Sequence, residues 1–174
     1  MENANPLSWF LALALAFGLA GCRGDAPAAP DGLKTVADRF EIDVGGRSVR
    51  LQVAVLSAEL ERGLMGRRDL GADEGMIFIF DSPQRLGFWM HDTLIPLDVG
   101  YFTADGELAE VYPMFPFDER AVSSRSSRLQ FALEMNQGWF ARNEVRPGAR
   151  LDLGALIAAL RARGFSPKKL GLPQ

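Results

Sequence analysis

FEIDVGGRSVRLQVAV, residues 40–55, carries the clearest structural signal in this 174-residue chain. Apolar residues alternate with charged or polar ones on both sides of Gly45-Gly46, over residues 40–44 and 49–55. A period of two is typical of a strand with one buried face, and paired glycines supply the positive φ angles of a tight turn. The stretch therefore predicts a β-hairpin.

The segments that follow predict more strands, with one helix between them. Residues 57–65 break the alternation, and Ser57 as N-cap with Glu59 in the first turn predicts a short helix. Residues 76–80 (MIFIF) are apolar at every position. Such a run is typical of a strand covered on both faces, so we expect it at the centre of the sheet. Further strands are expected at residues 86–90, 97–103 and 107–112, the last two joined by a turn at 104–106.

The second half of the chain continues this pattern less regularly. A loop rich in serine is expected at residues 114–128. After it we expect an extended segment at 129–135, a helical turn at 137–144, a closing strand at 150–153 and a helix at 156–163. The whole pattern predicts a mainly β chain, a compact single-domain β-sandwich or barrel-like fold with two or three short helices.

The N-terminal segment predicts export. Residues 7–20 (LSWFLALALAFGLA) form an uncharged apolar stretch that is typical of a signal peptide and too short for a comfortable membrane span. The sequence Leu19-Ala20-Gly21-Cys22 that follows resembles the lipobox of bacterial lipoproteins. The resemblance implies that residues 1–21 are cleaved as a signal peptide and that Cys22 becomes the acylated N-terminus. An unmodified cysteine in an ordinary secretory signal or in a core helix is the alternative.

The predicted anchor has consequences for location and organisation. Residues 22–38 are expected to be a flexible tether, since their Ala, Pro, Gly and Asp cannot bury enough apolar surface to fold. A domain at 39–153 and a C-terminal helix and tail at 154–174 follow. Acyl chains would hold the protein on a membrane of the cell envelope, facing the periplasm. Arg23, in place of the aspartate of inner-membrane retention, favours the outer membrane.

Composition argues against several classes of function. The formal net charge is −3 and Lys and Arg form no run, which disfavours nucleic-acid binding. A single cysteine cannot form an intrachain disulfide. One histidine with scattered acids lacks any familiar ligand spacing, so no metal site is predicted, and no motif indicates a cofactor.

Four blocks in order resemble a known family. They are GLMGRRDL (residues 63–70), EGMIFIFD (74–81), FWMHDTLIPLDVGYFTADG (88–106) and ALEMNQGWFARNEVRPGARL (132–151). Together they look like the bacterial and archaeal family called domain of unknown function 192 (DUF192). The resemblance implies a compact β-sandwich or barrel-like domain with minor helices, often behind a signal peptide or lipobox. It implies no established reaction and no catalytic residues.

Two departures from the family pattern bear on function. The family tends to have Lys or Arg and then Asn after F-W-M, where this sequence has His91-Asp92. A contact between that basic position and an anion would therefore depend on pH here. Residues 154–174 extend beyond the matched blocks, and we expect them to pack over a sheet edge.

Two acidic residues stand out because they lie in apolar segments. Asp98 is flanked by Leu97 and Val99, and Glu134 by Leu133 and Met135. A buried carboxylate needs partners, such as backbone N–H groups or an arginine. For Asp98, the candidates include Arg67, and its role is either to brace the bend at Pro96 or to face a ligand.

The candidate site residues are Trp89, His91, Thr93, Asp98, Arg67 and Glu134. We expect a non-enzymatic ligand-binding or accessory module that holds a small molecule, peptide or glycan near these side chains. Alternatives are an envelope hydrolase that uses His91 with Asp98 or Glu134, and a protein-interaction domain with an unknown partner. The first is favoured because the sequence offers no nucleophile, metal cage or nucleotide loop.

Overall fold

The computed structural model describes residues 32–173. Residues 33–173 belong to one compact unit. The expected signal peptide, Cys22 and the first part of the expected tether lie outside the described residues.

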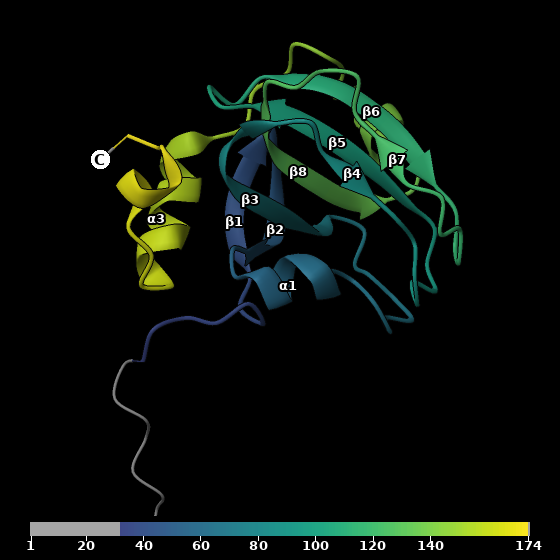
Figure 1. The fold of residues 1–174 in the computed structure, drawn as a ribbon, viewed down its shortest axis with the longest axis horizontal. Helices are drawn as coiled ribbons and strands as arrows, with labels where there is room; N and C mark the ends of the chain where they lie inside the picture. Colours follow the sequence, from purple (N-terminus) through teal and green to yellow (C-terminus); the bar gives the residue numbers. More distant parts are fainter. Residues whose placement is uncertain (1–31, 174) are drawn as a thin grey trace, which may run out of the picture. The chain divides into compact units, whose positions relative to one another are not determined.

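An open sheet of six strands forms the framework (Figure 1). Its order is β1-β2-β3-β8-β5-β6, and a second sheet pairs β4 with β7. The strands are β1 (Phe40–Val44), β2 (Arg47–Ala54), β3 (Glu74–Gln84), β4 (Gly87–Phe88), β5 (Leu97–Thr103), β6 (Leu108–Met114), β7 (Val122–Ser123) and β8 (Leu129–Asn136). The helices are α1 (Ser57–Arg62), α2 (Trp139–Arg142), α3 (Leu153–Ala162) and a 3₁₀ helix, η1 (Pro167–Leu170).

The strands that the sequence marked most clearly are confirmed. β1 and β2 form the antiparallel hairpin around Gly45-Gly46, whose φ angles are 63° and 82°. β3 lies inside the sheet between β2 and β8. β2 and β3 are parallel, so the chain between them must cross the sheet, and α1 lies in that crossover. The MIFIF run is therefore covered on both faces.

The two faces of the sheet carry separate cores. One contains Ile77, Leu133 and Met135 together with Trp139 of α2 and Leu160 of α3. The other contains Met76, Phe78, Val99, Tyr101 and Ala132, beneath Leu64 and Phe88. α2 and α3 thus cover the face with the first core. α1, the residues that follow it up to Leu64, and β4 cover the face with the second core.

Several local predictions are corrected by the structure. The mainly β class is confirmed, and the described sheet ends at the edge strands β1 and β6, so it is not a closed barrel. The predicted closing strand is reduced to two isolated bridges, Val44 to Leu151 and Glu107 to Arg150. The predicted strand at residues 86–90 pairs at two positions only, and the loop predicted at 114–128 contains its partner, β7. The N-cap of α1 is Leu56 and not Ser57, since the helix already begins at Ser57, and the Glu59 carboxylate accepts a hydrogen bond from the Leu56 N–H at 3.0 Å.

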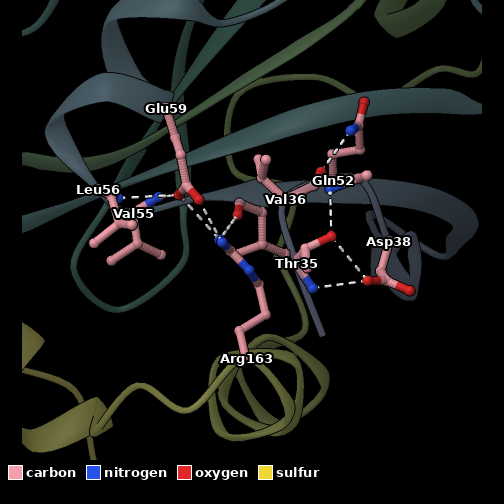
Figure 2. A network of polar contacts seen from close by, with 10 residues as sticks. Thr35, Val36, Asp38, Gln52, Val55, Leu56, Glu59 and Arg163 are labelled. Atoms are coloured by element: carbon pink, nitrogen blue, oxygen red, sulfur yellow. Dashed lines mark hydrogen bonds and ion pairs between the residues drawn. The ribbon is translucent and has the colours of Figure 1, made fainter. Parts of the chain in front are cut away.

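A buried ion pair joins α1 to the C-terminal helix (Figure 2). The guanidinium of Arg163, at the C-cap of α3, donates to Glu59 on α1 at 2.5 Å and also to the Val53 carbonyl. Both side chains are largely shielded from solvent. α3 itself lies beside the edge strand β1 (Figure 1). The C-terminal residues therefore hold α1 against the sheet.

Candidate functional site

A cavity of about 310 Å³ lies between α1 and the second face of the sheet. One wall is formed by helix α1 and by residues 63–65, which follow it. The other wall is formed by β3, β8 and residues 87–93, which include β4. The residues that matter for its chemistry are Gly63, Phe78, Phe88, Trp89, Thr93 and Glu134. We call it the Glu134 cavity.

Glu134 is the buried acid of this cavity. It lies on β8 between Met76 of β3 and Val99 of β5, and only 5% of its surface is exposed. Within residues 32–173, its Oε2 atom has no hydrogen-bond partner. Burial raises the pKa of this carboxyl to about 8. At neutral pH the side chain is therefore mostly an uncharged acid with spare hydrogen-bonding capacity.

Gly63 lets the chain approach this acid closely. It follows the last residue of α1 and has a φ of 47°. A Cβ at this position would lie 3.3 Å from Phe78 Cζ and 3.8 Å from Glu134 Oε2. Only glycine combines this backbone conformation with the close contact at low cost.

A cluster of aromatic and charged side chains lies at the rim of the Glu134 cavity. Trp89 is 46% exposed, and its ring stacks on His91 with centroids 4.9 Å apart. His91 Nδ1 lies 2.8 Å from Glu119 Oε1, and His91 Nε2 lies 3.5 Å from Asp92 Oδ2. The hydrogen bond with Glu119 raises the pKa of His91. β4 ends at Phe88, and Asp92 adopts a φ of 47° in the turn that follows His91.

The sequence of this domain matches a known family. The DUF192 family, described as an uncharacterized ACR, matches residues 40–153. The chain belongs to this family. The match ends where α3 begins, yet Leu156 and Leu160 of α3 are fully buried in the first core of the DUF192 domain.

Two crystal structures resemble the DUF192 domain. One is of a "putative transcription regulator" from Sinorhizobium meliloti 1021, with 31% identity and a TM-score of 0.62, over 66% of this chain and 92% of that one. The other is of a protein of unknown function from Novosphingobium aromaticivorans DSM 12444, with 31% identity and a TM-score of 0.62, over 70% of this chain and 99% of that one. No curated protein matches the sequence.

Asp98 lies away from the Glu134 cavity. The register pairs Asp98 with Met135, and Glu134 with Val99, so the two acids project from opposite faces of the sheet. Asp98 is 6% exposed, and its Oδ2 accepts a hydrogen bond from the Gly138 N–H at 2.8 Å. Burial raises its pKa, and that hydrogen bond opposes the rise. This arrangement braces the turn before α2.

Arg67 lies at a second cavity, of about 490 Å³, on the other side of α1. Its guanidinium donates to the side-chain oxygen of Gln52, whose Nε2 donates to the Val36 carbonyl at 2.5 Å. Glu59, which also lines this cavity, is paired with Arg163. Gln52, Glu59 and Arg67 thus each have a side-chain partner, in contrast to Oε2 of Glu134 within the described residues.

The structure thus brings three of the six predicted residues together. Trp89, Thr93 and Glu134 line one cavity, with His91 stacked behind Trp89. The predicted site residues did not include Gly63, Phe78 or Phe88. The G-L-M-G string after a predicted helix was the available signal for Gly63, whereas nothing in the sequence marks Phe78 apart from its neighbours.

Within residues 32–173 no group of three or more His, Cys, Asp or Glu side chains is arranged to hold a metal ion. Across the same residues, no helix is long and apolar enough to cross a membrane.

Proposed function

We propose that this protein is a non-enzymatic ligand-binding module of the cell envelope and that the Glu134 cavity takes a small organic molecule. One observation carries the proposal: Glu134 Oε2 is buried beside the cavity without a hydrogen-bond partner from the part of the chain that the structure describes. An unsatisfied buried polar atom costs roughly 1–3 kcal/mol, and folded proteins rarely retain one without a reason. A ligand that bonds to this carboxyl would recover that free energy.

The chemistry around the cavity favours binding over hydrolysis. The one hydroxyl among its lining residues belongs to Thr93, and it donates to the His91 carbonyl at 3.1 Å. The hydrolase alternative paired His91 with Asp98 or Glu134, but the imidazole contacts Glu119 and Asp92. The described lining therefore offers no side-chain nucleophile with an adjacent base, the arrangement that covalent hydrolysis uses.

Native mass spectrometry of the protein purified from the cells that make it tests the proposal. We expect a small-molecule adduct that survives gentle ionisation. Leu60→Trp, which adds bulk on the α1 wall of the cavity, should abolish the adduct. Leu56→Trp is the matched control, because Leu56 is 53% exposed and lies outside the cavity lining. An adduct that persists in Leu60→Trp, or a wild-type protein with no adduct and no response to a panel of small molecules, would contradict the proposal.

The envelope location rests on Cys22 and its resemblance to a lipobox residue. We expect the full chain to incorporate an alkyne-tagged fatty acid in bacterial cells and to fractionate with membranes. Cys22→Ser should abolish both the label and the membrane association. A label that remains on the Ser variant, or an unlabelled wild type, would refute the anchor.

A further inference from the structure

We propose that the ligand of the Glu134 cavity is a small organic ammonium ion. Its charged nitrogen would lie beside the Glu134 carboxylate, and its alkyl groups would lie against the aromatic lining. The inference rests on the proposed function and adds the chemical class of the ligand.

Aromatic side chains supply one half of such a site. Phe78 and Phe80 of β3, Phe88 of β4 and Trp89 all line the cavity. Phe78 and Phe88 meet edge to face, with centroids 4.8 Å apart. Aromatic ring faces carry negative electrostatic potential, and groups of them bind alkylated ammonium ions more readily than anions. This electrostatic preference of the rings disfavours an anionic ligand.

Glu134 supplies the other half. Burial is the cause of its raised pKa, and no charged side chain contributes to the rise. When the carboxyl ionises, its charge therefore lacks a compensating cation from residues 32–173. An organic cation in the cavity would provide that compensation in a site of low dielectric, where the attraction is strong.

The other titratable groups around Glu134 do not substitute for this cation. Tyr101 of β5 shares its face of the sheet, and burial raises the pKa of this phenol, so it stays neutral. β3 presents Met76 and Phe78. On α1, Glu61 and Arg62 line the cavity with opposite charges on exposed side chains, which solvent screens. His91, behind Trp89, is held by Glu119.

Binding of the cation is coupled to loss of a proton. The neutral Glu134 carboxyl releases its proton to solvent and becomes the carboxylate that faces the ammonium group. The apparent affinity is the affinity of the ionised protein multiplied by the fraction of the protein in which Glu134 is ionised. With the pKa at about 8, affinity should rise about tenfold from pH 6 to pH 7 and level off above pH 8.

Isothermal titration calorimetry of the full chain with choline tests this inference. Neohexanol, in which carbon replaces the ammonium nitrogen, is the uncharged probe of matched shape. We expect choline to bind with the tenfold gain per pH unit and to release a proton, seen as heat that varies with the ionisation enthalpy of the buffer. Neohexanol should bind more weakly and without release. Glu134→Gln should remove the pH dependence and, at pH 8 and above, weaken choline binding by at least tenfold.

Asp98→Asn is the control, since this buried acid projects from the other face of the sheet. It should leave choline binding unchanged, and urea unfolding would verify that both variants are folded. The ammonium inference fails if choline does not bind, if neohexanol binds equally well, or if Asp98→Asn has the effect expected of Glu134→Gln. The proposed function would survive each of these results if native mass spectrometry finds a different, non-cationic ligand in the same cavity.

Discussion

Replacing Glu134 by glutamine should change how the stability of the protein depends on pH. Glutamine has nearly the same shape but cannot ionise. Burial raises the pKa of Glu134 from 4.5 to about 8 in the folded protein. Between these two values the folded state keeps a proton that the unfolded state has lost. The stability that this proton provides is fully present below pH 4.5 and is lost as the pH rises toward 8.

The magnitude follows from linkage. Each pKa unit corresponds to about 1.4 kcal/mol, and between pH 5 and pH 7 almost all of that slope applies. The wild type should therefore lose about 2.5 kcal/mol of unfolding free energy over this interval because of Glu134 alone. The Gln variant should not show this loss. Subtracting the unfolding free energy of the Gln variant from that of the wild type at each pH cancels the contribution of the other titrating groups.

Urea unfolding followed by tryptophan fluorescence at pH 5, 6 and 7 measures this difference. Glu41→Gln is the control, because Glu41 is an exposed carboxyl on β1 of the same sheet, and it should follow the wild type. Parallel stability curves for the wild type and Glu134→Gln would refute the reasoning, since they would mean that Glu134 ionises in the folded protein much as it does in the unfolded chain.

Three further predictions concern the rim, the ion pair and the C-terminal helix. The imidazole of His91 should titrate by NMR above its usual pKa of 6.5, and Glu119→Gln should lower the midpoint; equal midpoints would show that the ionic contact does not persist in solution. Arg163→Met should lower the unfolding free energy by about 3 kcal/mol, because it leaves the buried carboxylate of Glu59 without its partner. Arg161→Met is the control and should change the unfolding free energy little, because Arg161 is exposed on α3. Leu160→Ala, at a fully buried position, should cost roughly 2–5 kcal/mol in thermal or chemical unfolding, and a near-neutral result would mean that α3 is not part of the core.

The mainly β fold was predictable because its signals are local. The alternation at residues 40–55 and the apolar run at 76–80 each depend on near neighbours, and both gave the right elements. The closing strand was not predictable in detail. Leu151 meets Val44 more than a hundred residues away, and a short apolar run does not reveal how many positions will pair.

The candidate site was predictable in part, for a similar reason. Asp98 and Glu134 gave the same signal in the sequence, an acid between apolar neighbours. The register between β5 and β8 places them on opposite faces, and only pairing decides that. The Arg163 to Glu59 contact joins residues 104 positions apart, so local patterns carried no trace of it.

The proposed ligand site requires an acid without a compensating charge in the Glu134 cavity. Carbon-13 NMR of the side-chain carboxyl of Glu134, titrated in the ligand-free protein, measures whether such a charge is absent. We predict a midpoint at about 8, with the resonance assigned by its loss in Glu134→Gln. A midpoint at or below the usual value of 4.5 would contradict the account, because it would show that the carboxylate is already solvated or paired.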